Sequence, residues 1–277
     1  MKVFRYILGD FYREGGKMPL SPVAKGKIKR MIMSELRRKI EEFSEREDMN
    51  KPFYFRLFSK EVVYTASLLQ SIFTWFGGKW EYFAEIIARE NFPRVKRRYR
   101  LKGTITSKEL IVIDTILKEL DEGVRTPDIE RTKQEILQAY DKNDSYKEKS
   151  HIIDLFIETE NGEEYYFELK TVKPNKKEVR AAKRDFLEVL AMRHKEKDLV
   201  KVHVFLAIPF NPYFSEEYSR WTVIKFFKPG DDLLVGKDFW NLLGGENTYE
   251  DLLNTFEEVG EELMDIIERT INRLVEE

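Results

Sequence analysis

The sequence contains no cysteine and only three histidines, His151, His194 and His203, among its 277 residues. The absence of thiols excludes disulfides, a cysteine nucleophile and a cysteine-ligated zinc site. The histidines form no HExxH pair, so the helix motif of the zinc metalloproteases is missing as well. We expect all three histidines to be structural or surface residues without a catalytic role.

Long apolar runs are also missing. No segment approaches the roughly 18 consecutive apolar residues that span a bilayer. The first residues, "MKVFRYILGDFYREGG", mix charges with apolar side chains and carry no small-residue cleavage site, which is not the pattern of a signal peptide. We therefore expect a cytoplasmic protein. Its content of 35% charged residues, mostly Lys, Glu and Arg, is compatible with a thermophile.

A strong net charge of either sign is missing too, since the formal total is −2. The distribution is nevertheless uneven. From Asp231 to the C-terminus fourteen acidic residues stand against three basic ones, whereas residues 1–230 carry 45 basic and 36 acidic side chains. Binding of a polyanion depends on local patches more than on the total charge. The segregation therefore permits a nucleic acid partner without requiring one.

Apolar spacing and end signals predict helices in the first half of the chain. Ser21 followed by Pro22 is a favoured helix start, and Gly77-Gly78 is a favoured helix end. The predicted helices cover residues 21–45, 60–76 and 79–91, and two more begin near Ser107 and near Asp128.

Two polar stretches separate these predicted elements. "RVKRRYRLK" (residues 94–102) carries six basic residues and a tyrosine. Two interpretations of it stay open, a solvated loop or a contact with phosphate groups. "DKNDSYKEKS" (residues 141–150) is typical of a loop.

The apolar period changes to two at residue 151. "HIIDLFIETENGEEYYFELKTV" (residues 151–172) predicts a β-hairpin that turns at Asn161-Gly162. The elements expected after it are a helix over about 175–195, strands over 199–210 and 220–227, and a helix from about Thr248. The order helix, strand, strand, helix, strand predicts an α/β (α+β) core with helical flanks.

We expect a single domain of 277 residues. Its helical N-terminal part would cover residues 1–76, its core residues 77–230, and its acidic helical C-terminal part residues 231–277.

Two carboxylates and a lysine stand in the predicted hairpin. Asp154 interrupts an apolar strand, where an unpaired carboxylate is costly. On the partner strand Glu168 and Lys170 share one face, because strand side chains alternate. A strict two-residue turn would set Asp154 opposite Leu169. A three-residue loop with Gly162 in the left-handed conformation would set Asp154 opposite Glu168, with Lys170 diagonal to both. We predict this second register, or a bulge elsewhere in the hairpin.

Two carboxylates that converge with a lysine suit Mg²⁺, which takes few protein oxygens and keeps several waters. The ion polarises a phosphoryl oxygen and makes a bound water more acidic. Lys170 would orient that water or help to deprotonate it, and would offset charge that develops on the phosphate. The alternative is a structural cluster of ion pairs.

Asp154 followed by Glu168-Leu169-Lys170 resembles the D…ExK signature of the PD-(D/E)xK nuclease superfamily, with Ile153 in place of the usual proline. Three further stretches resemble type II restriction endonucleases, in particular the TdeIII-like group: "GGKWEYFAEIIA" (77–88), "ELKTVKPN" (168–175) and "VGKDFWNLLGGENTYEDLLNTF" (235–256). The resemblance implies a restriction-endonuclease-like core, in which helices flank a mixed central sheet and helical extensions lie at both termini. Residues 77–230 would then be the catalytic nuclease core.

The resemblance also implies an activity, the hydrolysis of phosphodiester bonds in double-stranded DNA at a short, GC-rich palindrome of the GGNCC type. It implies Mg²⁺ as the cofactor, with Mn²⁺ as a substitute. It further implies a homodimer and a cognate methyltransferase in the same system, with no direct contact between the two enzymes.

The same resemblance assigns roles to individual residues. Asp154, Glu168 and Glu81 would bind the metal and, with Lys170, form the catalytic set. Glu85 is the second choice for the position of Glu81. The side chains expected to approach the DNA backbone are Lys173, Asn175, Lys176, Lys177 and Arg180.

Two alternatives remain open at this point. A repair or junction-resolving nuclease would use the same residues, although the chain length and "GGENTYEDLL" favour a restriction enzyme. A non-catalytic nucleic-acid-binding protein would use Asp154, Glu168 and Lys170 as a structural cluster, and would bind equally well in a chelator. Side chains that read bases are expected in the loops around 210–220 and 228–236.

Overall fold

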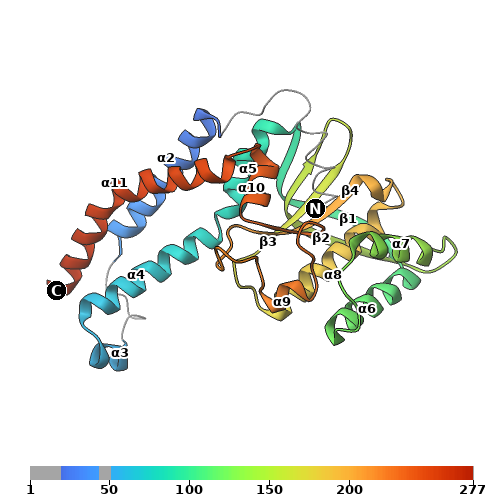
Figure 1. The fold of residues 1–277 in the computed structure, drawn as a ribbon, viewed down its shortest axis with the longest axis horizontal. Coiled ribbons are helices and arrows are strands. Elements are labelled where there is room, and N and C mark those ends of the chain that lie inside the picture. Colours follow the sequence, from blue (N-terminus) through green and yellow to red (C-terminus); the bar gives the residue numbers. More distant parts are fainter. Residues whose placement is uncertain (1–19, 44–50, 277) are drawn as a thin grey trace.

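The fold is built on one five-stranded sheet, which lies near the centre of Figure 1. The computed structural model describes residues 20–43 and 51–276. The strands are adjacent in chain order: β1 (Arg94–Thr106), β2 (Tyr146–Glu158), β3 (Glu164–Leu169), β4 (Val202–Ile208) and β5 (Leu233–Val235). Neighbours among β1, β2 and β3 pair antiparallel, whereas β3, β4 and β5 pair in parallel. This mixed sheet confirms the predicted fold class.

Helices cover both faces of the sheet and build a separate core on each. The first core buries Leu155 and Phe167 and is formed with α2 (Pro22–Glu41), α4 (Lys60–Gly77), α5 (Trp80–Asn91), α10 (Lys237–Gly244) and α11 (Thr248–Glu276). The second core buries Phe156 and Tyr166 and is formed with α6 (Ser107–Glu122), α7 (Ile129–Ala139), α8 (Lys176–Arg193) and α9 (Trp221–Ile224). A short helix, α3 (Pro52–Leu57), precedes α4.

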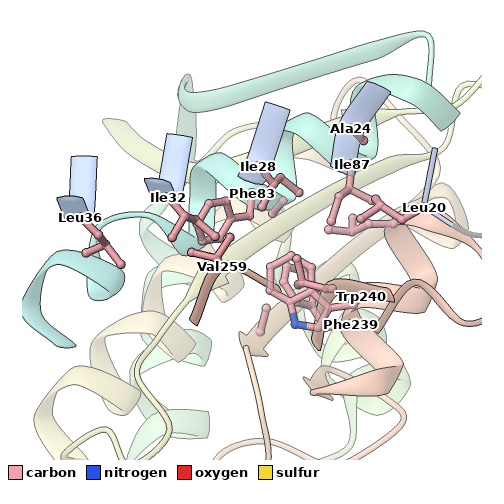
Figure 2. Packing of buried hydrophobic residues seen from close by; sticks show 14 of the residues in the cluster. Leu20, Ala24, Ile28, Ile32, Leu36, Phe83, Ile87, Phe239, Trp240 and Val259 are labelled. Atoms are coloured by element: carbon pink, nitrogen blue, oxygen red, sulfur yellow. The ribbon is translucent and has the colours of Figure 1, made fainter. Parts of the chain in front are cut away.

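The N-terminal and C-terminal helices pack against each other at one end of the molecule (Figure 1). Figure 2 shows Ile28 and Ile32 pointing from α2 into the first core, in which Val259 of α11 also lies. Lys25 forms an ion pair of 2.6 Å with Glu258, and Lys29 forms one of 2.9 Å with Glu262. The acidic C-terminal helix therefore neutralises cations of α2, so part of the charge segregation is internal to the fold.

The predicted helix ends agree well with the structure. The Ser21 hydroxyl accepts the Ala24 N–H at 3.1 Å and caps α2 ahead of Pro22, as expected for a favoured start. Helix α2 ends at Glu41, and the predicted end at residue 45 lies outside the described residues. Helix α4 ends at Gly77, as predicted. Among the described helices, none is both long enough and apolar enough to cross a membrane.

The hairpin formed by β2 and β3 has the predicted register. Leu155 lies opposite Phe167, and the Thr159 N–H donates to the Glu163 carbonyl at 2.9 Å. The loop between Thr159 and Glu163 has three residues. The last of them, Gly162, takes a φ of 75°, which glycine adopts without strain. The predicted three-residue loop is therefore confirmed, and the register that it sets holds as far as the last pair, Leu155 and Phe167.

The loop interpretations of the two polar stretches are wrong in most of their length. Residues 94–102 belong to β1, and β2 begins at Tyr146, within the stretch predicted as a loop. In β1 every second side chain from Arg94 to Lys102 is exposed and basic, and only Val95, Leu101 and Ile105 of this strand are buried apolar residues. Apolar residues this sparse give no period-two signal. The strand forms all the same, because pairing with the neighbouring strand holds its backbone.

The predicted strand over 220–227 is also wrong, since residues 221–224 form α9. Val223, Phe226 and Phe227 are buried while Trp221 is exposed, a spacing of three and four residues that suits a helical turn. A short apolar run does not separate strand from helix by its pattern alone. The last strand of the sheet is β5 instead.

Candidate active site

The candidate site lies where two neighbouring strands change the faces that their side chains occupy. Strands β1 and β2 pair over their whole length except at one position, where Arg98 lies across from Asp154. Before this point Val95 and Leu155 face the first core, and beyond it Leu101 and Ile153 face the second. Residues of equal parity normally share a face.

The change of face coincides with an unusual backbone conformation at Arg98. Its φ is 52°, in the left-handed region, which costs a non-glycine residue about 1–2 kcal/mol. At this turn of β1, Asp154 of β2 lies between the two cores, and its carboxylate is buried in neither of them. The side chain of Asp154 is half-buried.

Asp154 bonds directly to the partner strand of the hairpin. The ladder between β2 and β3 ends at Leu155 and Phe167, and one carboxylate oxygen of Asp154 then accepts the Leu169 N–H at 2.8 Å. On its other side β3 stays attached to β4, because the Lys170 N–H donates to the Ala207 carbonyl at 3.0 Å. Asp154 is therefore held at the end of β3, next to Glu168 and Lys170.

Glu168 and Lys170 form an ion pair of 2.6 Å in which neither side chain is fully buried. Their exposed fractions are 18% and 26%. Burial and then the charge of Asp154 raise the pKa of Glu168 to about 7. Burial likewise raises the pKa of Asp154. Burial lowers the pKa of Lys170, but the charge and hydrogen bond of Glu168 together with the charges of Asp154 and Glu178 outweigh it, and the net shift is upward. Negative charge is therefore crowded at this point.

Helix α5 places Glu81, and not Glu85, beside this cluster. Burial and the charge of Asp154 raise the pKa of Glu81, so these two carboxylates lie close enough to repel each other. Glu85 is engaged elsewhere, in ion pairs with Arg89 at 2.7 Å and Arg97 at 3.1 Å. The structure thus brings Asp154, Glu168, Lys170 and Glu81 into one site.

The donor set of the site suits Mg²⁺. Asp154 and Glu168 offer carboxylate oxygens, and Mg²⁺ binds through one or two carboxylates while it keeps several waters. A divalent cation would also offset the charge of Asp154, which together with burial raises the pKa of Glu168. Within residues 20–43 and 51–276, no three His, Cys, Asp or Glu side chains converge closely enough to hold a metal by themselves. Glu81 is near Asp154 but does not complete such a set.

The residues predicted to approach DNA lie at the start of α8, and several have partners within the protein. Asn175 caps the helix by accepting the Glu178 N–H at 3.0 Å. Lys176 forms an ion pair of 2.5 Å with Asp121, and Arg180 lies 3.9 Å from the same carboxylate. The other two predicted contacts are exposed, and they are Lys173 and Lys177.

The histidines have structural surroundings, as expected. His151 lies between Asp185 and Glu188 of α8, at 3.3 and 2.9 Å. The ion pairs outweigh burial and raise its pKa to about 9. His194 bonds to the buried Glu109 at 2.5 Å. His203 stacks on Tyr165, and burial lowers its pKa to about 3.

Sequence reasoning did not single out Arg98, whose charge acts on this site. The charge of Arg98 lowers the pKa of both Asp154 and Glu81. The signal available in the sequence was the basic run of residues 94–102, but nothing in that run distinguishes one arginine from the next.

Comparison of the sequence with known proteins identifies a family. A family model described as "Type II restriction endonuclease, HinfI" matches residues 22–260, which include all four site residues. The type II restriction enzyme HgiEI of Herpetosiphon aurantiacus is 24% identical over 266 residues, which cover 88% of this chain and 95% of that protein. The type II restriction enzyme MjaII of Methanocaldococcus jannaschii is 28% identical over 187 residues, which cover 62% of this chain and 49% of that protein.

Proposed function

This chain belongs to the HinfI family of type II restriction endonucleases, which are site-specific DNA hydrolases, and we propose that Asp154, Glu168, Lys170 and Glu81 form its catalytic site. The observation that supports the proposal is the hydrogen bond of 2.8 Å from the Leu169 N–H to the Asp154 carboxylate, which holds Asp154 at the end of β3 beside Glu168 and Lys170. Because the chain belongs to this family, we no longer favour the two alternatives, a repair nuclease and a non-catalytic nucleic-acid-binding protein.

We propose that Asp154 and Glu168 hold Mg²⁺, or Mn²⁺ in its place, with Glu81 as a further carboxylate on the same side. When bound, the ion would polarise the scissile phosphoryl group and supply a more acidic water. The Leu169 N–H keeps one oxygen of Asp154 in place, and the other oxygen would serve as the ligand.

Lys170 would act on the water and on the phosphate. Its ammonium group is held by Glu168 at 2.6 Å and is partly open to solvent. From there it would orient the attacking water and offset the charge that develops on the phosphate oxygens. The same lysine would offset part of the carboxylate charge that a phosphodiester meets at the site.

Contacts with the DNA backbone are proposed at the start of α8. Lys173 and Lys177 are the stronger candidates because both are exposed. Lys176 and Arg180 share Asp121 and would contact phosphate only by leaving it. Asn175 is the weakest candidate, because its side-chain oxygen accepts the Glu178 N–H and its own N–H donates to the Glu178 carboxylate, both at 3.0 Å.

The proposed target is a short palindrome of the GGNCC type, and the resemblance to the TdeIII-like group is its only support. A palindrome is matched by a two-fold dimer, so we propose a homodimer. We further propose that the enzyme acts in the cytoplasm together with a cognate methyltransferase. We retain the proposal of one domain with its nuclease core in residues 77–230.

The test is cleavage of plasmid DNA by purified protein in Mg²⁺ or in EDTA. Asp154→Ala and Lys170→Ala are compared with wild type and with Glu160→Ala, a control at the exposed tip of the same hairpin. Discrete Mg²⁺-dependent fragments that vanish only in the first two variants would support the site, and sequencing of the ends would identify the target. Equal cleavage by all four proteins would refute the assignment.

A further inference from the structure

Arg98 occupies a position in the sheet that no apolar or pairing requirement explains. It lies across from Asp154 in the register of β1 and β2, yet the two residues do not pair as their neighbours do. Its φ of 52° turns the side chain away from the alternation of the strand. The side chain is exposed, and its charge acts on the carboxylates of Glu81 and Asp154.

The neighbouring arginine has the opposite character. Arg97 forms an ion pair with Glu85 at 3.1 Å, lies 3.8 Å from Glu81, and covers the ring of Tyr82 at 5.3 Å. The Arg98 guanidinium forms no ion pair or side-chain hydrogen bond within residues 20–43 and 51–276. Arg97 therefore stabilises the packing of α5 on β1, whereas the Arg98 guanidinium remains available to a ligand near the carboxylates.

A cation in this position would help the site to bind an anion. When ionised, Asp154, Glu168 and Glu81 carry three negative charges. Lys170 and Arg98 provide two positive ones, and the charge of Arg97, 3.8 Å from Glu81, is shared with Glu85. A phosphodiester would be repelled by such a site without a metal, and even with one it needs donors on the open side. A guanidinium offers a planar fork of N–H groups that matches two phosphate oxygens.

We propose that Arg98 is a further catalytic residue, whose guanidinium binds the non-bridging oxygens of the phosphate that is cleaved. The proposal rests on the proposed site formed by Asp154, Glu168 and Lys170. In the reaction, water forms a bond from its oxygen to phosphorus as the bond from phosphorus to one deoxyribose oxygen breaks. The water loses a proton to solvent and the departing oxygen takes one up, so nothing is oxidised or reduced. Arg98 stabilises the added negative charge on the non-bridging oxygens during this step.

The left-handed backbone suggests a competing role for Arg98, that of a residue needed only for the turn in β1. The two roles are separable, because glycine adopts this conformation more easily than any other residue. Arg98→Gly keeps the turn and removes the guanidinium, whereas Arg98→Ala removes the guanidinium and strains the turn. Arg98→Lys keeps the charge without the fork.

The experiment measures single-turnover cleavage at saturating DNA in Mg²⁺, and DNA affinity in EDTA. Lys147→Ala, which removes an exposed cation from the neighbouring strand, is the control. We expect the rate constant to fall about 100- to 1,000-fold in both Arg98→Gly and Arg98→Ala, as when one donor to a transition-state oxyanion is lost. Arg98→Lys should retain an intermediate rate. DNA affinity should change by no more than about threefold, because the contact is realised mainly in the transition state.

A second readout distinguishes a chemical role from a structural one. Guanidinium ion added at millimolar concentration should raise the cleavage rate of Arg98→Gly and leave wild type and Lys147→Ala unchanged. Lack of rescue together with loss of thermal stability would overturn the proposal, as would cleavage by Arg98→Gly at the wild-type rate. If Asp154→Ala also cleaves, the proposed site itself fails. If Asp154→Ala is inactive and Arg98→Gly is active, only the role of Arg98 fails.

Discussion

Two lysine–carboxylate pairs in this protein have nearly the same length and very different surroundings. Lys183 and Asp232 lie 2.5 Å apart, and each side chain is 1% exposed. Asp232 also accepts the Lys228 N–H at 2.8 Å, and Lys183 lies 4.8 Å from the ring of Phe227. Lys170 and Glu168 lie 2.6 Å apart, but they are partly open and share their surroundings with Asp154 and Glu81.

The two pairs differ in how the negative charge is matched. At Asp232 the negative charge is matched by one lysine and one backbone N–H inside a sealed core. At Glu168 a single lysine faces more than one carboxylate, and the excess of negative charge reaches solvent. A buried pair that is satisfied by its neighbours holds the fold, whereas an open cluster with excess charge is suited to a cation and a substrate. The alternative of a purely structural cluster at Glu168 is therefore the weaker one.

The largest expected effect is the loss of cleavage when the open cluster is altered. Asp154→Asn should lower the single-turnover rate constant by about 1,000-fold or more, because a metal ligand and its charge are removed. The free energy of unfolding should stay the same or rise, since Asp154 and Glu168 no longer repel each other. Urea denaturation of the same preparations measures the second quantity. A variant that is inactive because it is unfolded would count against this account.

The sealed pair should respond in the opposite way. Lys183→Met leaves Asp232 buried without its cation, and we expect the free energy of unfolding to fall by about 3–5 kcal/mol. Cleavage per folded molecule should not change. A double variant, Lys183→Met with Asp232→Leu, should recover part of the stability, because no charge is then left unpaired. If the single variant is as stable as wild type, the pair does not hold the core together.

A third ion-pair cluster makes the stability depend on pH. The pKa of His151 is raised to about 9 by Asp185 and Glu188, against an ordinary value near 6.5, with Lys149 and Arg184 also at Glu188. A raised pKa means that this contribution is fully present below pH 6.5 and is lost as the pH rises through 9. We expect a loss of about 2–3 kcal/mol of unfolding free energy over this range.

His151→Gln should abolish most of that pH dependence, which urea denaturation at a series of pH values would measure. His194→Gln serves as the matched control, because its partner Glu109 keeps a second cation, Lys195 at 3.0 Å. Parallel curves for wild type and His151→Gln would show that the cluster does not titrate in this way.

The smallest effect is expected at the third carboxylate. Glu81→Gln should lower the cleavage rate by about 10- to 100-fold, as for a group that supports a metal site from outside the main ligands. Glu85→Gln, one helical turn away, should change it by less than about threefold, because Glu85 is committed to Arg89 and Arg97. Equal effects of the two substitutions on single-turnover rates would mean that α5 does not contribute a specific carboxylate.

The sequence predicts the hairpin and the register of its two strands well because the information is local. Alternating apolar residues set the faces of β2 and β3, and Gly162 sets the loop and thereby the register. The helix starts at Ser21 and at Thr106 are predictable for the same reason, since the capping side chains are adjacent to the helices that they cap.

The features that the sequence did not reveal depend on residues that are far apart. β1 is a strand because β2 pairs with it, and its own charged residues show no strand pattern. The Lys183–Asp232 pair joins residues 49 positions apart, and no local rule connects them. Arg97 forms an ion pair with Glu85 of α5, whereas Arg98 does not. This difference depends on where α5 packs, and the basic run alone does not reveal it.

The central claim is that the open pair carries the chemistry and the sealed pair carries the fold. The direct test makes the same substitution in both and compares Lys170→Met with Lys183→Met in single-turnover cleavage of plasmid DNA in Mg²⁺, at a temperature where both are folded. We expect Lys170→Met to be stable and inactive, and Lys183→Met to be less stable and fully active per folded molecule. Cleavage by Lys170→Met at the wild-type rate would contradict the account.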